Sequence, residues 1–394
     1  MIPRSISPLL LKRTLSSTPP PMSKKTQSSL PASYYRGGTS RAIMFQKSTL
    51  PASQSSWGPI FRSILGSPDP YGRQLDGMGG GISSLSKVCV VGGSTHKDAD
   101  VDYTFAAIGV RDSEVDFSSN CGNMSAAVGG FAVDCGLIKT DIQAEGTRER
   151  DVMVRIHNTN TGKIIHATFP VVHGEAVADG ELAIDGVAGT GAAVKLDFMD
   201  PAGSRTGKML PTGVAREVIG GVEATCIDVA NPCVFVKAAD LGVEGDLTPD
   251  EMTSTHGLLG RLDAIRREAG VRMGLADSVE TVPGSVPKIG IVSEPREKGA
   301  GAGVDLVVRA LSVGQPHKAV PITVALALAA AARVPGSTVA DVTSEDPVDK
   351  AGITIGHASG SILVGATFGE GDRLEYATVF RTARRLFEGR VFWK

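Results

Sequence analysis

The sequence predicts an α+β protein made of two similar halves, each with a β-sheet curled around a central buried helix. Residues 124–133 and 320–334 are runs of small apolar residues, and a helix that is apolar on every side is normally buried. Strand patterns surround each run, and their order repeats after a Gly-, Pro-, Ser- and Thr-containing stretch at 202–213. We therefore expect an N-terminal domain over 31–205 and a C-terminal domain over 206–394.

The first half predicts strands on both sides of one helix. Apolar segments indicate strands at 42–45, 88–91, 100–109, 152–156, 164–168 and 194–198. Asn160-Thr-Gly162 between two of them is typical of a hairpin. The helix is expected to begin at Cys121 and to end near Gly136.

The second half follows the same plan. Strands are expected at 225–229, 234–236, 288–292, 304–310, 362–364 and 376–380. Thr248 and Pro249 predict the start of a helix that runs to Arg267 or Glu268, since Thr favours the N-cap and Pro the first helical position. Residues 315–318 are expected to open the second apolar helix, Val320–Val334.

Composition excludes several classes of protein. The 394 residues carry a formal net charge of −2, which offers no basic excess for nucleic acid. No apolar run is long enough to span a bilayer, so we expect no membrane partner. Five irregularly spaced cysteines without a CxxC argue against both a disulfide framework and a zinc site, and we expect no bound metal.

The N-terminal segment differs from the rest of the chain. From Met1 to Pro68 there is no Asp or Glu, and basic residues alternate with Ser, Thr and Leu. This pattern predicts that residues 1–30 are a disordered tail or a transit peptide, which favours mitochondrial import. Initiation at Met22 would give a cytoplasmic form, and that alternative stays open.

A thiol stands where the first buried helix should begin, at Cys121-Gly-Asn123. The first turn of a helix presents unpaired N–H groups and a partial positive charge, which bind carboxylates and lower the pKa of a cysteine. Cys121 is therefore a candidate acid, base or nucleophile beside an anion site. The alternative is a small buried cysteine that only caps a core helix.

Lys87 is the second candidate for chemistry. It follows a loop rich in glycine and serine, residues 77–86, whose N–H and hydroxyl groups can approach an anion closely. The loop does not complete a nucleotide-binding GxxxxGK[ST] motif, which leaves a smaller anion. A partly buried lysine near other cations can act as a base. The alternative is a surface lysine that starts a strand.

The remaining candidates share the capacity to donate hydrogen bonds. Around the proposed helix starts and glycine loops stand Arg36, Thr39, Ser40, Ser84, Ser86, Asn123, His317 and Lys318. Because acidic residues are absent from those loops, the expected ligand is a small di- or tricarboxylate. No cofactor motif accompanies these residues, so we expect no cofactor. A cofactor-free reaction served by Lys and Cys is a proton abstraction next to a carboxylate.

Several motifs, in order, resemble the PrpF family. They are Arg36-Gly-Gly-Thr-Ser40, Gly79-Gly-Gly-Ile-Ser-Ser-Leu-Ser-Lys87, Asn120-Cys-Gly-Asn123, Asp200-Pro-Ala-Gly203, Leu311-Ser-Val-Gly-Gln-Pro-His-Lys318 and Arg381-Thr-Ala-Arg384. That family includes 2-methylaconitate cis-trans isomerase and relatives that act on methylitaconate, aconitate and oxalomesaconate. The resemblance implies the diaminopimelate epimerase-like fold, whose two similar domains agree with the pattern above.

The resemblance also implies roles for residues of this chain. Lys87 matches the catalytic lysine and Cys121 the motif cysteine that faces the substrate. The carboxylate pockets would be lined by Thr39, Ser40, Ser84, Ser86, Gly122, Asn123, Asn231 and His317. The expected partner is a small di- or tricarboxylate, and a homodimer is an open alternative.

The resulting hypothesis is an isomerase that moves a proton in an unsaturated di- or tricarboxylate such as 2-methylaconitate or aconitate. Lys87 would remove a proton beside the double bond, and donors at the helix N-termini would hold the resulting anion. Alternatives are an amino-acid epimerase or racemase of the same fold, a more distant phenazine-biosynthesis-like isomerase, and a non-catalytic carboxylate-binding protein. The two-cysteine racemase mechanism is disfavoured because Pro316-His317, rather than cysteine, precedes the second apolar helix.

Overall fold

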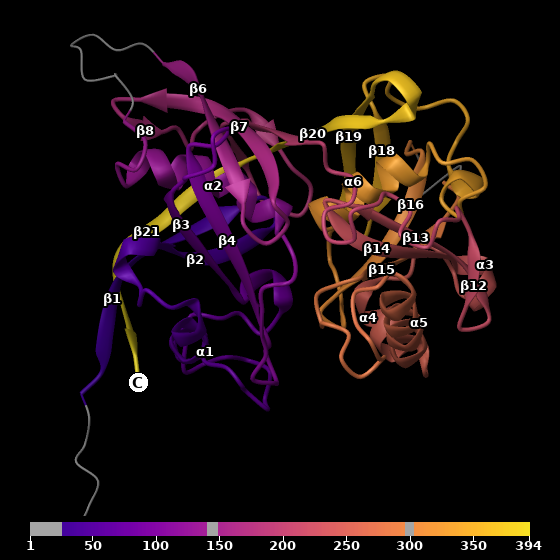
Figure 1. Ribbon diagram of the computed structural model, residues 1–394, viewed down its shortest axis with the longest axis horizontal. Coiled ribbons are helices and arrows are strands. Elements are labelled where there is room, and N and C mark those ends of the chain that lie inside the picture. Colours follow the sequence, from indigo (N-terminus) through magenta and orange to yellow (C-terminus); the bar gives the residue numbers. More distant parts are fainter. Residues whose placement is uncertain (1–25, 140–148, 296–302) are drawn as a thin grey trace, which may run out of the picture.

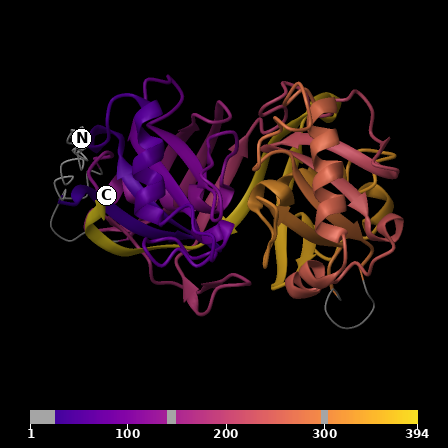
Figure 2. The same cartoon turned by 90° about the horizontal axis from the view of Figure 1, so that it is seen from below.

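The protein folds into two lobes that lie side by side. A computed structural model describes residues 26–139, 149–295 and 303–394. Strands enclose helix α2 (Gly122–Asp134) in the first lobe and helix α6 (Ile322–Ala331) in the second (Figure 1). Seen from below, the C-terminal chain runs from the second lobe back to the first (Figure 2). The predicted α+β fold, a sheet curled around a buried helix in each half, is confirmed.

The first lobe holds most elements of the N-terminal half. Its sheet contains β1 (Ser28–Gly37), β2 (Ser40–Gln46), β3 (Lys87–Gly93), β4 (Val101–Ile108), β5 (Val115–Asp116), β6 (Arg150–Asn158), β7 (Lys163–Val172), β8 (Glu175–Ala176) and β11 (Val194–Met199). Helix α1 (Trp57–Leu65) packs its apolar side against β2, β3 and β4. Short elements complete the lobe: η1 (Lys47–Thr49), η2 (Gln54–Ser56), η3 (Ser83–Leu85), β9 (Leu182–Ala183) and β10 (Thr190–Gly191).

The second lobe is built in the same way. Its strands are β12 (Glu217–Ile219), β13 (Val222–Val229), β14 (Asn231–Lys237), β15 (Lys288–Ser293), β16 (Leu306–Ser312), β17 (Gln315–Pro316), β18 (Ile353–His357) and β19 (Gly360–Phe368). Its other helical segments are α3 (Ala238–Leu241), α4 (Pro249–Ser254), α5 (Leu258–Arg272), η4 (Ala340–Val342) and η5 (Glu370–Asp372). The last strands, β20 (Leu374–Arg381) and β21 (Ala383–Trp393), lead back to the first lobe.

Strand pairing repeats in the two lobes. In the first, β1–β2 is antiparallel, β2–β3 parallel, β3–β4 antiparallel, β4–β6 parallel and β6–β7 antiparallel. In the second, β13–β14, β14–β15, β15–β16, β16–β18 and β18–β19 follow the same sequence of directions. The internal repeat expected from the order of strands is therefore present at the level of topology.

Both central helices are buried because nearly every side chain on them is small or apolar. In α2 the residues from Gly122 to Val133 are buried, and in α6 all residues from Ile322 to Ala331 are buried. The start of the first helix was predicted correctly, with Cys121 as its N-cap. The second is shorter than predicted, because Pro321 is its extended N-cap and residues 315–316 form β17 instead.

The helix predicted from Thr248 to Arg267 or Glu268 is two helices. Thr248 forms the expected cap, since its hydroxyl accepts from the N–H of Glu251, whose carboxylate accepts in return from the N–H of Thr248. Helix α4 nevertheless ends at Ser254, and Gly257 with φ +73° precedes α5. A left-handed residue cannot continue a right-handed helix, and glycine adopts that conformation readily.

Sheet pairing crosses the expected domain boundary between 205 and 206. Strand β20 pairs with β11, and β21 pairs with β1 along its whole length. Strand β19 joins both sheets, pairing with β18 over 360–364 and with β20 over 365–368. Residues 28–30, expected in a tail, belong to β1, whereas 1–25 lie outside the described residues. The C-terminal half therefore completes the sheet of the first lobe.

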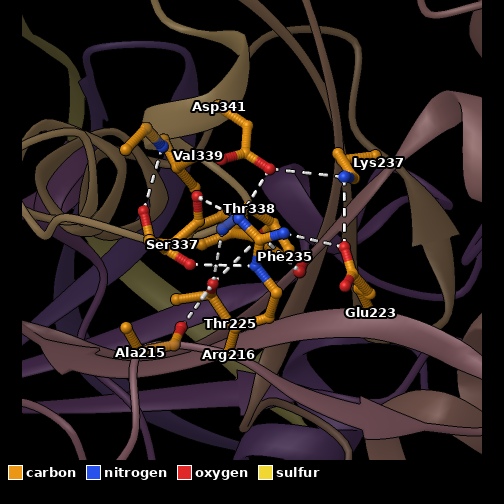
Figure 3. A network of polar contacts seen from close by, with 12 residues as sticks. Ala215, Arg216, Glu223, Thr225, Phe235, Lys237, Ser337, Thr338, Val339 and Asp341 are labelled. Carbon is orange, nitrogen blue, oxygen red and sulfur yellow. Dashed lines mark hydrogen bonds and ion pairs between the residues drawn. The ribbon is translucent and has the colours of Figure 1, made fainter.

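A network of polar contacts fixes the chain that follows α6 against β13 and β14 (Figure 3). Arg216 contacts Glu223 at 2.9 Å and Asp341 at 2.6 Å, and Lys237 contacts the same two carboxylates at 3.2 and 3.3 Å. Each cation bridges two anions, so the four side chains form a closed ring of ion pairs on the partly exposed edge of the lobe.

Thr225 forms the buried centre of that network. Its hydroxyl donates to the carbonyl of Ala215 at 2.8 Å and accepts from the N–H of Thr338 at 2.8 Å (Figure 3). The side chain is fully buried, so water cannot replace these partners. The segment after α6 is thus held by a hydrogen bond that only a hydroxyl at position 225 supplies.

We predict that Thr225→Val lowers the free energy of unfolding by about 2 kcal/mol, because it leaves the buried N–H of Thr338 without its partner and removes the hydrogen bond to the partly buried carbonyl of Ala215. Urea denaturation measures the effect. The control is Thr190→Val, an exposed threonine on β10, which should change stability by less than about 0.5 kcal/mol. Equal denaturation midpoints for the two variants would contradict this account of the network.

Candidate active site

The N-termini of α2 and α6 meet at a narrow cavity between the lobes. Both lobes contribute its lining residues: Ser40, Lys87, Phe105, Ala107, Ser119, Asn120, Cys121, Gly122, Asn123, Ser285, Lys288, Ser312, Val313, His317, Pro321, Ile322 and Thr323. The free volume of this cavity is about 20 Å³, which is room for about one water molecule. A larger ligand therefore needs the lobes or the lining side chains to move apart.

The first turn of α2 directs backbone donors at this cavity. The first intrahelical bond runs from the N–H of Ser125 to the carbonyl of Cys121, so the N–H groups of Gly122 and Asn123 have no acceptor within the helix. The Cys121 side chain makes no capping bond and lies with its Sγ 4.0 Å from the Ser40 hydroxyl. A thiol and a hydroxyl thus stand beside a helix terminus that favours anions.

Asn123 connects this helix terminus to the turn between β1 and β2. Its amide accepts from the N–H of Thr39 at 3.3 Å and donates to the Thr39 hydroxyl at 3.1 Å. Gly38 in that turn has φ +50°, and an added Cβ would lie 2.1 Å from the Asn123 amide oxygen. The turn therefore requires glycine, and the close approach places Ser40 at the cavity.

Asn231 plays the corresponding part at the second helix, but from behind the cavity. Its amide accepts from the N–H of Asn120 at 2.9 Å and donates to the carbonyl of Asn120 at 2.8 Å. It also donates to the Thr323 hydroxyl at 3.0 Å. Asn231 is fully buried and does not line the cavity. Asn231 therefore links the starts of α2 and α6 and is not placed to contact a ligand.

Two buried lysines supply the charge of the site. Lys87 begins β3 and Lys288 begins β15, and each residue is 7% exposed. The Lys87 ammonium lies 5.0 Å from the centre of the Phe105 ring, and that of Lys288 donates to the carbonyl of Ser285 at 3.1 Å. Among the described residues that line the cavity there is no Asp or Glu. The electrostatics therefore favour an anionic ligand.

His317 adds a neutral donor. Burial, together with the charges of Lys87 and Lys288, lowers its pKa to about 4, so the imidazole is uncharged at neutral pH. Its Nδ1 lies 3.1 Å from the N–H of Ala319 and accepts that hydrogen bond. The geometry assigns the proton to Nε2, which leaves Nε2–H as a donor.

The structure brings six of the predicted site residues together at the cavity: Ser40, Lys87, Cys121, Gly122, Asn123 and His317. Asn231 and Thr39 do not line the cavity but bond to residues that do. Asn231 bonds to Thr323, and Thr39 bonds to Asn123. The roles assigned to these residues remain predictions.

Four other predicted residues lie outside the cavity lining. Arg36 donates to Thr382 and to the carbonyl of Gly38, and Ser86 donates to Gln74 and to the carbonyl of Ile82. Lys318 is exposed, and Ser84 in η3 is also not part of the lining. The donors of Arg36 thus link the β1–β2 turn to the junction of β20 and β21, and the Ser86 hydroxyl stabilises its own loop.

Lys288 is the charged lining residue that the sequence reasoning missed. The expected strand at 288–292 was recognised, but its first residue was not considered. A signal was present, because Lys87-Val-Cys-Val-Val91 and Lys288-Ile-Gly-Ile-Val292 both place a lysine before four strand residues. The repeat of strand order would have paired these two segments.

Two lobes of this construction with a cavity between them define the diaminopimelate epimerase-like class of proteins. A hydroxyproline epimerase from Agrobacterium vitis has the same fold, with a TM-score of 0.50 at 12% identity and 92% of each chain covered. Within this class the chain belongs to the PrpF family, whose family model, described as PrpF protein, matches residues 27–394.

Relatives of known name place the chain among isomerases. It is 39% identical to 3-methylitaconate isomerase of Eubacterium barkeri, over 93% of this chain and 97% of that protein. Identity with 2-methyl-aconitate isomerase of Cupriavidus necator is 36%, over 94% and 98%. A crystal structure of methylitaconate-delta-isomerase matches with a TM-score of 0.72 and 38% identity, over 93% and 96%. The predicted family and the predicted class of enzyme, an isomerase, are confirmed.

We predict that Gly122→Ala lowers turnover about 10- to 100-fold, because small displacements of reacting groups are costly. The added Cβ would lie 2.7 Å from the Ile322 Cβ and would push the two helix N-termini apart. Steady-state kinetics measure the effect. The control is Gly260→Ala on α5, where an added Cβ meets no atom within 4 Å and turnover should not change. Wild-type turnover in Gly122→Ala would contradict the tight contact.

Proposed function

We propose that this protein is a cofactor-independent isomerase that moves a proton in an unsaturated di- or tricarboxylate. The observation that carries the proposal is the cavity in which two helix N-termini and two buried lysines meet without a lining carboxylate. Such a site stabilises negative charge that develops on a substrate. The names of the relatives support the same chemistry, since they are isomerases of methylitaconate, methylaconitate and oxalomesaconate.

The proposed reaction begins with removal of a proton from a carbon next to the double bond. Lys87, as the free amine, takes this proton, and the electron pair spreads through the double bond into a carboxylate to give a dienolate-like anion. Rotation about the former double bond, followed by return of the proton to the same carbon, gives the cis-trans isomer, and return of a proton at the other end of the allyl system gives the double-bond isomer. Bonds form and break only in the proton transfers, which a correctly placed amine accelerates by about 10²- to 10⁴-fold.

Donors at the cavity would hold the substrate carboxylates and the developing negative charge. The N–H groups of Gly122 and Asn123 and the Ser40 hydroxyl belong to the first lobe, and the His317 Nε2–H belongs to the second. Because these groups are fixed by the fold before the ligand arrives, they need little reorganisation during the reaction. Cys121 lies among them and is the candidate partner of Lys87.

The substrate belongs to a small set of related acids. Relatives with different named substrates are similarly close, at 36% to 39% identity. We propose 2-methylaconitate, 3-methylitaconate, oxalomesaconate and aconitate as the panel to assay. These molecules share carboxylates on an unsaturated carbon chain with a removable proton beside the double bond. NMR in deuterated water follows both isomerisation and exchange of that proton.

An amino-acid racemase mechanism finds less support in the geometry. That chemistry uses a cysteine at each buried helix, but the N-cap of α6 is Pro321, which has no proton to give. A carboxylate-binding protein without catalysis would bind the acids of the panel and exchange no proton. Deuterium incorporation by the wild-type protein separates the enzyme from the binding protein.

We predict that Lys87→Ala lowers interconversion at least about 100-fold and abolishes deuterium incorporation into the isomer that Lys87 deprotonates, because the base is lost. Cys121→Ser, assayed beside it, should lose less activity, since the helix N-terminus is unchanged. Both rates come from NMR in deuterated water. Turnover like the wild type in Lys87→Ala would sink the proposed mechanism.

The cellular location rests on the N-terminal segment. The family match begins at residue 27, so the predicted tail or transit peptide, residues 1–30, lies almost entirely outside the matched region. No helix in the described ranges is long and apolar enough to cross a membrane. The relatives named above come from bacteria, which favours the cytoplasmic alternative, and we propose it over mitochondrial import.

We predict that a fluorescent protein fused after residue 30 stays in the cytoplasm of a eukaryotic cell, because Pro3 and Pro8 break the amphipathic helix that import favours. Microscopy with a mitochondrial dye measures the distribution. A fusion that begins at Met22 is the control. Mitochondrial accumulation of the longer fusion alone would reinstate the transit peptide.

A further inference from the structure

We propose that Lys288 is the residue of the second lobe that binds a carboxylate of the substrate, and that it does so as a fixed ammonium group. It moves no proton of the substrate, since that role stays with Lys87 and its candidate partner Cys121. The inference rests on the function proposed above and deepens it, because it gives one substrate carboxylate a charged partner and separates the binding cation from the base.

Lys288 is a buried cation of the cavity without a lining counter-charge. The residue is 7% exposed and lines the cavity, where the described residues include no Asp or Glu. Burial of a charge without a paired opposite charge is unfavourable for folding. A carboxylate of the ligand would supply the missing partner, so the cost of burying this lysine is explained by binding.

The hydrogen bonding of Lys288 leaves donors for a ligand. Its ammonium donates to the carbonyl of Ser285 at 3.1 Å, and this is its one acceptor within the described part of the chain. An ammonium group has three N–H donors, so two remain. A carboxylate offers two oxygen acceptors, and hydrogen bonds between such charged groups are stronger than neutral ones.

The surroundings of Lys87 differ from those of Lys288. The Lys87 ammonium lies 5.0 Å from the centre of the Phe105 ring and donates to no acceptor among the residues that the structure describes. A base must present a free lone pair, and no hydrogen bond orients Lys87 as a donor. A carbonyl orients Lys288, which suits a group that donates to a bound anion.

The acceptor of Lys288 is itself fixed against the first lobe. The N–H of Ser285 donates to the Asp116 carboxylate at 2.9 Å, and its hydroxyl lies 3.0 Å from the hydroxyl of Ser118. Asp116 and Ser118 belong to β5 and the segment after it, in the first lobe. The position of Lys288 therefore depends on contact between the lobes. A ligand that binds both Lys288 and the N–H groups at the start of α2 would join the two lobes.

The protonation of Lys288 suits a binding cation. Burial, and next the charge of Lys87, lower its pKa to about 8. Titratable groups face it from both lobes: Lys87, Cys121 and Asp116 from the first, and Cys233 and His317 from the second. The two thiols and Asp116 act against the lowering, and His317 is uncharged at neutral pH. Most Lys288 side chains are therefore ammonium groups near pH 7.

This protonation links binding to pH. A bound carboxylate favours the ammonium form of Lys288, so binding raises its pKa. Above about pH 8 the free protein has lost this proton, and binding must first restore it. The affinity for a carboxylate ligand therefore falls as the pH rises above the pKa of Lys288.

The first test measures binding without turnover. Tricarballylate and methylsuccinate are saturated tri- and dicarboxylates that cannot isomerise, and calorimetry gives their affinities. We expect Lys288→Met to weaken the binding of at least one of them at least about 30-fold, because a charged partner is lost. Lys87→Met should weaken it no more than about 10-fold, the loss of a neutral hydrogen bond. Lys350→Met, at an exposed lysine outside the cavity, is the matched control and should equal wild type.

The second test uses pH. Wild-type affinity for the same probe should be about 10-fold weaker at about pH 9.5 than at about pH 7, where the probe carboxylates are ionised. Lys288→Arg should bind almost equally at the two pH values, because arginine stays charged. A merely structural role for Lys288 would not transfer this pH dependence to the residue at position 288.

The kinetic counterpart is a different response of KM and kcat. With the acids of the panel, Lys288→Met should raise KM at least about 30-fold and lower kcat less than Lys87→Ala does. Urea denaturation checks the fold of Lys288→Met, which should be at least as stable as wild type, because an apolar side chain replaces a buried charge.

Three results would overturn the role of Lys288. The first is probe binding by Lys288→Met within about threefold of wild type, or an equal loss in Lys87→Met. The second is an unchanged pH dependence in Lys288→Arg, which needs no folded methionine variant. The third is wild-type protein that binds neither probe. If the wild type binds a probe but exchanges no proton with any acid of the panel, the proposed isomerase function fails, and the binding measurements still decide the role of Lys288.

Discussion

The site depends on one buried amide. Asn231 hydrogen-bonds to both backbone groups of Asn120, just before α2, and to the hydroxyl of Thr323 in the first turn of α6. Two helix N-termini carry like partial charges and, with two lysines nearby, repel one another. The amide holds them in place with neutral hydrogen bonds that bring no compensating negative charge. The site therefore carries a positive electrostatic potential that the fold holds in place. A bound anion would neutralise it.

The sequence predicted those parts of the structure that depend on local composition. A run of ten small apolar residues is longer than most strands and favours a buried helix, and α2 with its cap at Cys121 followed from it. The split between α4 and α5 did not, because it is set by the backbone conformation of two residues, Thr255 in an extended and Gly257 in a left-handed conformation. The pairing of β21 with β1 was also missed, since sequence patterns indicate strands but not their distant partners.

It was harder to predict which hydrogen-bond donors face the cavity than to predict the strands. Arg36 and Ser86 have the chemistry of carboxylate ligands, yet they bond to other residues of the protein: Arg36 to Thr382, between β20 and β21, and Ser86 to Gln74. Asn231 also donates a hydrogen bond, but its acceptor is the backbone carbonyl of Asn120. A residue type reveals that a hydrogen bond will form but not whether its partner is a ligand or a neighbouring segment. Lys288 is the opposite case. As a lysine at the start of a strand it was not predicted to be a site residue, but the repeated fold places it in the cavity lining.

The return of the C-terminal strand has a consequence for synthesis of the chain. Ser28 pairs with Trp393, so β1 lies against a strand that is synthesised only after the second lobe. Strand β1 can pair with β2 early, but its other edge stays open until the second lobe has been made and β21 follows it. The second lobe is inserted within the first, and its own sheet can form before the first is finished. Such long-range pairing slows folding and leaves an unpaired edge open to association while synthesis continues.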